Sequence, residues 1–162
     1  MLLLAFSWNV IAADSVNLGV TGNIIASPCV FNGGSANLDI NLGNIQATNM
    51  ATPGSTSDPV SFNLQFTQCP AGTRSVTVSF TGTPDPAAGA DYYMNSGSAT
   101  NVAIAMREAA TGTLKGTGSS ISQNIAPDRT ATMAMLASVK SVTGGATPGS
   151  VSAVVVMTMQ YN

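Results

Sequence analysis

Apolar residues recur at every second position in short runs along the chain, and Gly, Pro, Asn and Asp separate one run from the next. This alternation places apolar side chains on one face of an extended strand and polar side chains on the other. Each run therefore predicts a β-strand that ends at a turn. The predicted strands cover residues 16–24, 38–42, 60–66, 76–80, 102–106, 131–137 and 151–161.

No segment shows an apolar period near 3.6 over three helical turns, so no amphipathic helix is expected. About seven short strands joined by turns are typical of an antiparallel β-sandwich. A chain of 162 residues fits one domain of ordinary size and leaves little room for a second core. Because 44% of the residues are apolar and the net charge is only -2, the chain is not of the disordered class. We therefore expect a single all-β domain.

The charged residues argue against several classes of function. Only 7% of residues are charged and no cluster of Lys and Arg occurs, so neither nucleic acid nor an anionic membrane surface is an expected partner. The sequence has no His, the commonest general base and metal ligand, and two Cys alone cannot complete a zinc site. We therefore expect no enzyme activity, no metal site and no cofactor. The acidic groups are scattered singly: Asp14, Asp39, Asp58, Asp85, Asp91, Glu108 and Asp128.

Aromatic residues make up 6% of the chain and form no stacking platform of the kind that binds single-stranded nucleic acid or sugars. Tyr92 and Tyr93 form a pair in a predicted loop. We interpret the pair as an anchor against the rim of the sandwich rather than as a ligand site, because a Tyr combines an apolar ring with one polar tip.

Residues 1–12 form a short apolar stretch that ends in Val10-Ile11-Ala12, a small-residue pattern suited to signal peptidase. We predict a secretory signal peptide cleaved after Ala12; the alternative is that these residues form a first strand. The stretch is shorter than the roughly 20 apolar residues that span a bilayer, so membrane insertion is not expected. No Lys or Arg precedes the apolar run, which favours a true start upstream of Met1.

The chain has two cysteines, Cys29 and Cys69. In an oxidising compartment an even number of cysteines is normally paired, so export predicts one disulfide between them. The alternative is two buried free thiols.

The first alternating run lies almost at the start of the predicted mature chain, where chains are usually polar and frayed. Such a strand can form an edge of its own sheet, or it can pair with an edge of another copy. The residues alone leave both arrangements open. The alternating row consists of Val16, Leu18, Val20, Gly22 and Ile24.

Several segments resemble the subunits of chaperone–usher fimbriae, most closely the minor tip subunits of type 1 fimbriae. Residues 13–24 resemble that family's N-terminal donor extension, with Gly22 in the family's position. Residues 27–29 and 67–73 are similar to its two cysteine segments, and residues 91–97 followed by residues 101–102 resemble a stretch of the type 1 minor subunits. The end of the chain is similar to the family's C-terminal signature, in which a Gly is fourteenth from the end and an aromatic residue is penultimate. Gly149 and Tyr161 hold those positions.

The resemblance implies an incomplete immunoglobulin-like antiparallel sandwich that lacks its final strand and so leaves an apolar groove. A periplasmic chaperone would fill the groove first, and at the outer-membrane usher a donor strand from a neighbouring pilin or adhesin subunit would replace it. The implied organisation is a signal peptide over residues 1–12, a donor extension over residues 13–24 and a pilin domain over residues 25–162. The residues expected to form the groove and the chaperone-recognition strand are Gly149, Val151, Ala153, Val155, Met157, Met159 and Tyr161.

The implied function is that of a structural minor subunit that links adhesin and shaft in an extracellular fimbria. An alternative is a secreted adhesin domain that binds a carbohydrate or a receptor, although the family's adhesins carry a separate lectin domain for which this chain has no room. Met157 and Met159 depart from the β-branched or aromatic residues that are commoner in the family, which predicts a softer groove or chaperone contact. Ser15 looks like an extra residue before the alternating row, so the register of the donor strand stays open by one or two positions.

Overall fold

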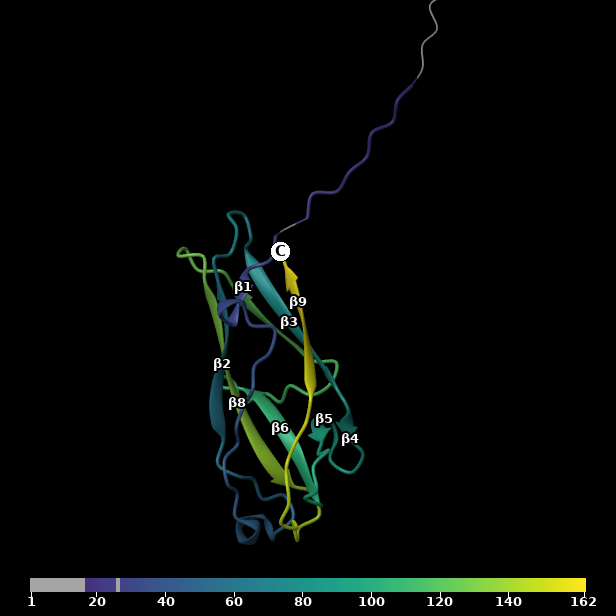
Figure 1. Cartoon of the computed structure of the whole chain (residues 1–162), viewed down its shortest axis with the longest axis vertical. Coiled ribbons are helices and arrows are strands. Elements are labelled where there is room, and N and C mark those ends of the chain that lie inside the picture. Colours follow the sequence, from purple (N-terminus) through teal and green to yellow (C-terminus); the bar gives the residue numbers. More distant parts are fainter. Residues whose placement is uncertain (1–16, 26) are drawn as a thin grey trace, which may run out of the picture.

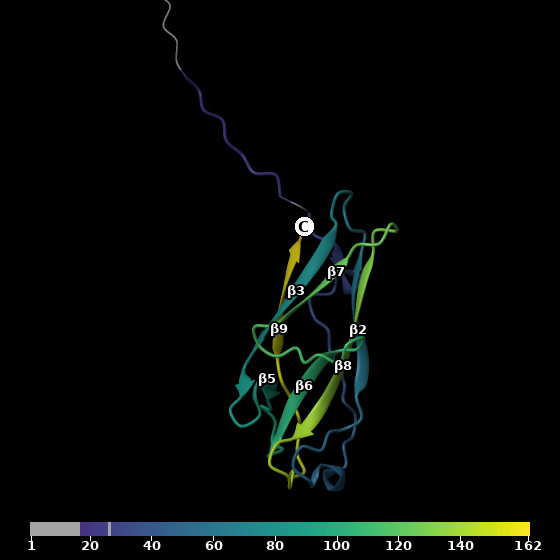
Figure 2. The ribbon, with the colours of Figure 1, turned by 180° about the vertical axis from the view of Figure 1, so that it is seen from behind.

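The computed structural model describes residues 17–25 and 27–162, so the predicted signal peptide, its cleavage point and Val16 lie outside the described residues. The described chain is an all-β sandwich of two antiparallel sheets and contains no α-helix (Figures 1 and 2). The larger sheet has the strand order β1-β2-β8-β6-β5-β4, and the smaller has the order β7-β3-β9. The strands are β1 (Val30–Phe31), β2 (Val60–Thr67), β3 (Ser75–Gly82), β4 (Pro84–Asp85), β5 (Gly89–Met94), β6 (Val102–Glu108), β7 (Ser120–Asn124), β8 (Ala131–Ser141) and β9 (Val155–Tyr161). Two short 3-10 turns complete the list: η1 (Asn32–Gly34) and η2 (Ala47–Met50).

β8 organises the larger sheet, because it pairs with β2 along residues 131–137 and with β6 along residues 135–141. β3 organises the smaller sheet, with β7 on one side and β9 on the other. The four runs predicted over residues 60–66, 76–80, 102–106 and 131–137 all lie within these strands. The alternation in each run therefore predicted its strand correctly.

The main core lies where β2, β3 and β8 face one another across the sandwich. Alternate residues of each strand point into it, as the inward rows of two packed antiparallel sheets must. Burial of each such side chain contributes about 1.5–3 kcal/mol to folding. Its fully buried apolar side chains include Leu64, Phe66, Val76, Val78, Phe80, Met133 and Met135.

Three segments with the same alternation are not strands in this chain: residues 17–24, 38–42 and 151–154. The prediction of strands there is wrong for the isolated chain. A strand needs a neighbouring backbone to complete its ladder of hydrogen bonds, and these segments lack one on at least one side. The alternation thus correctly identifies the apolar face of each segment, but it does not show whether a neighbouring strand is present to pair with it.

The predicted disulfide is present, because Cys29 and Cys69 are bonded with an S–S distance of 2.09 Å. It lies next to the short ladder in which Val30 pairs with Thr67, and it joins the residues before β1 to the residues just after β2. Both cysteines are buried in the main core.

The tyrosine pair was predicted in a loop but lies on β5, next to the edge strand β4 of the larger sheet, where it anchors against the sandwich as the sequence predicted. Tyr93 is buried, and its hydroxyl donates a hydrogen bond of 2.8 Å to the carbonyl oxygen of Lys115. Tyr92 accepts a hydrogen bond of 3.0 Å from the Lys140 ammonium group, which also lies 4.3 Å from the centre of its ring. Both rings therefore bind elements of their own domain.

Candidate functional site

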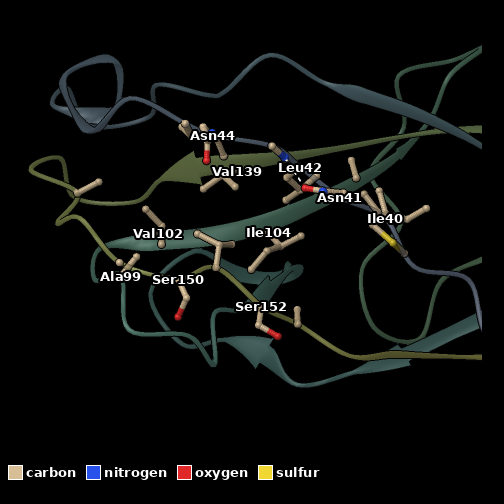
Figure 3. A pocket seen from close by; sticks show the side chains of 18 of the residues that line it. Ile40, Asn41, Leu42, Asn44, Ala99, Val102, Ile104, Val139, Ser150 and Ser152 are labelled. Atoms are coloured by element: carbon tan, nitrogen blue, oxygen red, sulfur yellow. Dashed lines mark hydrogen bonds between the residues drawn. The ribbon is translucent and has the colours of Figure 1, made fainter.

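A groove of about 780 Å³ runs between the two sheets along one side of the sandwich. One wall is formed by residues 38–45, and the other by residues 146–153 with Val155 and Met157 (Figure 3). Residues 38–45 follow β1 of the larger sheet, and residues 146–154 lead into β9 of the smaller sheet, so the two walls connect to different sheets without being strands themselves. The groove therefore lies where the two sheets would be joined by one further strand.

The floor of the groove is apolar. It is formed mainly by inward-facing residues of β2, β6 and β8, and the close view shows Val102, Ile104 and Val139 pointing into it (Figure 3). Met50 of η2 and Ala99 close one end of the groove as part of a second, smaller hydrophobic cluster. The floor side chains are Phe62, Phe80, Val102, Ile104, Met106, Ala137 and Val139.

The first wall has free backbone groups. Within the described residues, no backbone–backbone hydrogen bond involves residues 38–45. The amide of Gly43 is satisfied locally by the side-chain oxygen of Asn41, at 2.8 Å. Unpaired backbone groups along an extended segment are a template for another strand.

The second wall is paired on its outer side only. The carbonyl oxygens of Ser150 and Ser152 accept hydrogen bonds from Ala99 and Ser96, at 3.0 and 2.8 Å. Alternate residues of an extended chain point their backbone groups to opposite sides, so those of Val151 and Ala153 face the groove. Further along, β9 pairs only with β3 and is an edge strand of the described sheet. Both walls therefore offer edges to a strand placed between them.

The row predicted near the N-terminus does not fill this groove. Leu18, Val20 and Ile24 are 87%, 85% and 105% exposed, and nothing lies within 4 Å of the position of a Cβ atom added to Gly22. Residues 17–25 instead lead away from the sandwich at the end where the C-terminus lies (Figures 1 and 2). With Ile25, which is 83% exposed, this segment holds four large apolar side chains in solvent, which is unusual for a completed domain.

The structure divides the predicted groove residues into two groups. Gly149, Val151, Ala153, Val155 and Met157 line the groove. The other two lie beyond it, as half-buried parts of the main core.

Met159 and Tyr161 form that second group, and Tyr161 packs edge-on against Phe66 with 6.4 Å between the ring centres. Burial raises the pKa of the Tyr161 phenol. These two residues therefore hold β9 onto the core.

Sequence reasoning did not identify the first wall or the floor as parts of a site. The run over residues 38–42 predicted only a strand, and the floor residues have the pattern of ordinary core positions. The sequence did contain one signal for the first wall, the alternation of Leu38, Ile40 and Leu42. In the structure these residues line the groove instead of forming a strand paired within a sheet.

Little charge or metal-binding chemistry is present at the groove. Asp39 is its one charged lining residue. Over residues 17–25 and 27–162, no group of three His, Cys, Asp or Glu side chains is placed to hold a metal ion. No helix in this part of the chain is long and apolar enough to cross a membrane. The groove is suited to an apolar, strand-forming ligand.

Two sheets with unpaired edges across an apolar groove define the class of the protein as an immunoglobulin-like sandwich that lacks one strand. Comparison with known proteins then gives the family. The family described as Fimbrial protein matches residues 18–162, and the chain belongs to it. It is a structural subunit of an extracellular fimbria of the chaperone–usher type, as the resemblance predicted.

Individual relatives agree with this assignment. Protein FimG of Escherichia coli K12 is 29% identical over 160 residues, covering 99% of this chain and 93% of the relative. The fimbrial-like protein YdeR of the same organism, which is uncharacterized, is 33% identical over 144 residues, covering 89% of this chain and 83% of the relative. The crystal structure of the P pilus rod subunit PapA has the same fold, with a TM-score of 0.69 and 23% identity, covering 84% of this chain and 100% of that one.

Proposed function

We propose that the subunit is assembled by donor-strand exchange: its groove receives an extended strand from a neighbouring subunit, and its own residues 13–24 fill the groove of the next one. The observation that carries the proposal is the pairing of an open groove with an exposed apolar row in one chain. In this view the predicted organisation, with a donor extension over residues 13–24 and a pilin domain over residues 25–162, describes two parts that act in different subunits.

The geometry favours one direction for the incoming strand. The tail of this chain leaves at the end of the sandwich that carries the C-terminus, while η2 lies at the other end (Figure 1). A head-to-tail fibre repeats one contact without closing. The domain that supplies the incoming strand therefore lies beyond the η2 end, and its strand runs antiparallel to β9.

The spacing then suggests a register. Five wall residues alternate from Gly149 to Met157, and the donor row has five members from Val16 to Ile24. Antiparallel pairing places Ile24 beside Gly149 and Gly22 beside Val151. The large side chain of Ile24 then lies beside a glycine, and the glycine of the donor row lies beside the side chain of Val151. This complementarity of large and small residues is what close packing requires.

The energy of such a contact is large enough for assembly. Burying the four apolar members of the donor row, Val16, Leu18, Val20 and Ile24, contributes roughly 6–12 kcal/mol at about 1.5–3 kcal/mol each, before the entropy of ordering is subtracted. Hydrogen bonds to the two free edges of the groove add about 0.5–1.5 kcal/mol each. No nucleotide is needed to drive the exchange.

The same groove is the site at which we propose that a periplasmic chaperone binds first, by adding a strand of its own. The outer-membrane usher is then the place where a neighbouring pilin or adhesin subunit displaces the chaperone. The likeness to FimG and the resemblance to minor tip subunits support a position between adhesin and shaft. The cysteine pair and the predicted signal peptide support passage through the periplasm to the extracellular fimbrium.

The test is a pair of substitutions in the donor segment. Leu18→Asp places a charge in an apolar groove and is expected to stop polymerisation, because an unpaired buried charge is strongly unfavourable. Asn17→Asp adds the same charge one position away, on the row that faces out of the groove, and is expected to polymerise normally. Fibres are measured by electron microscopy and size-exclusion chromatography of subunits released from the chaperone.

Both variants are expected to keep the disulfide and to bind the chaperone normally, because the segment is exposed in the folded subunit. Normal fibres from the Leu18→Asp variant would refute the proposal. A synthetic peptide of residues 13–24 gives an independent check: it should displace the chaperone slowly from the partner subunit and then remain bound, since dissociation needs a whole paired strand to open.

A further inference from the structure

Methionine is concentrated at the groove. The chain has eight methionines, and Met50, Met106 and Met157 line this one site. Met50 is only 1% exposed at the closed end, whereas Met106 and Met157 are half-buried. They come from different sheets, since Met106 lies on β6 and Met157 on β9. The unfilled groove therefore leaves two thioethers accessible to small solutes.

We propose that Met106 and Met157 form an oxidation-sensitive modification site that controls whether the groove can receive a donor strand. This inference rests on the proposed function. The reagent class is a peroxide. The sulfur lone pair attacks one peroxide oxygen, the O–O bond breaks, and water leaves after proton transfer. The sulfur loses two electrons to become a sulfoxide, and the peroxide is reduced.

The surroundings explain why a sulfoxide would be harmful there. Met157 pairs with Phe80 across β9 and β3, and Met106 pairs with Ala137 across β6 and β8. The groove floor around them is apolar, with Phe62 as a further neighbour in the lining. A sulfoxide is polar and needs a hydrogen-bond donor when it is buried. The inward row of the donor strand consists of apolar side chains and Gly22, so those side chains supply none.

The modification is expected to depend on the state of assembly. A donor strand lying between the two walls would cover both sulfurs and exclude the peroxide. The unfilled subunit is then the sensitive form, and a subunit whose groove holds a chaperone strand or a donor strand is the resistant form. Oxidation would remove subunits from assembly without dismantling fibres that already exist.

Other methionines of the chain serve as internal controls. Met94 is 39% exposed on β5 and lies outside the groove, so it should oxidise at the same rate whether the groove is filled or not. Met133 and Met135 are 2% and 0% exposed in the main core, so they should resist oxidation in both states. Only Met106 and Met157 should change their rate on filling.

The experiment uses the full mature chain, refolded with its disulfide and kept dilute, and hydrogen peroxide as the probe. The Leu18→Asp substitution is included throughout to prevent the chains from filling one another. Peptide mass spectrometry follows sulfoxide formation with and without the donor peptide of a neighbouring subunit, and fluorescence polarisation measures the affinity of that peptide before and after oxidation. Oxidation of the unfilled groove is expected to weaken binding by roughly ten- to a hundredfold.

A double variant separates the groove sulfurs from the rest. Met106→Leu with Met157→Leu removes both groove sulfurs at nearly the same side-chain volume, and its affinity before peroxide treatment serves as its own reference. It is expected to bind the peptide equally before and after peroxide treatment, whereas the control Met94→Leu should lose binding on oxidation as the parent does. Unchanged affinity of the oxidised parent, or lost affinity of the oxidised double variant, would overturn the assignment. Failure of the untreated parent to bind any donor peptide would instead count against the proposed function.

Discussion

Removal of the disulfide gives the most direct test of the energetic reasoning about this fold. Cys29 and Cys69 are separated by 40 residues in the sequence. In the chain-entropy model, opening a loop of this length lowers the free energy of the unfolded chain by about 4 kcal/mol. Little in the secondary structure compensates for that loss, because the ladder beside the disulfide joins only Val30 and Phe31 to the end of β2. The Cys29→Ala and Cys69→Ala double variant should therefore lose roughly 2–5 kcal/mol of stability.

Equilibrium unfolding in urea, followed by circular dichroism, measures this loss as a lower midpoint. Alanine is preferable to serine because both cysteines are buried in an apolar cluster, where a new hydroxyl would need a hydrogen-bond partner. The parent protein treated with a thiol reductant is the control and should approach the midpoint of the double variant. A double variant that unfolds at the same urea concentration as the oxidised parent would refute the reasoning.

Two further predictions concern a buried hydroxyl and a glycine. Tyr93→Phe removes the hydrogen bond to Lys115 and should lower the free energy of unfolding by about 1 kcal/mol in urea titrations. Burial raises the pKa of Tyr93 to about 12, above its unfolded value of about 10. The contribution of Tyr93 to the free energy of unfolding is therefore complete below about pH 10 and falls as the pH rises toward about 12. Between these pH values the urea midpoint of the Phe variant should depend less on pH than that of the parent. Gly97→Ala would press a methyl group against the backbone of Ser150 and displace one groove wall, so peptide-binding assays should show roughly tenfold weaker donor binding. Gly19→Ala, whose methyl meets nothing within 4 Å, should leave that affinity unchanged.

The alternation of apolar residues predicted β2, β3, β6 and β8, which have neighbours on both sides, and also the edge strand β9. β8 is the clearest case, because its inward row is buried and both of its edges are paired. β7 was not predicted, since Ser120–Asn124 contains a single apolar residue, Ile121, and depends on pairing with β3. β1, β4 and β5 were also not predicted. β1 and β4 have two residues each, too few for any period to be visible, and β5 had been interpreted as a loop around its tyrosine pair.

The candidate site was only partly predictable for a related reason. Val102, Ile104 and Val139 have the sequence pattern of core residues, and they differ from other core residues only in that no strand of the described chain covers them. A missing strand leaves no mark in the local sequence. The wall from Gly149 to Met157 was identified because the C-terminal segment resembles a family signature, which is information that periodicity does not contain.

The disulfide also lies at the point where the tail joins the domain, and this has a mechanical consequence. In a fibre built by donor strands, tension would enter each subunit along residues 17–28 and reach Cys29 first. The covalent bond would pass that tension to Cys69, just beyond the end of β2, so that the two-residue ladder of β1 need not resist it. β2 would then be pulled along its length against β8, to which seven residue pairs join it, from Val60–Ala137 to Phe66–Ala131. Seven pairs sheared together yield at a higher force than pairs opened one at a time, so the subunit would be strongest along the axis on which the fibre is pulled.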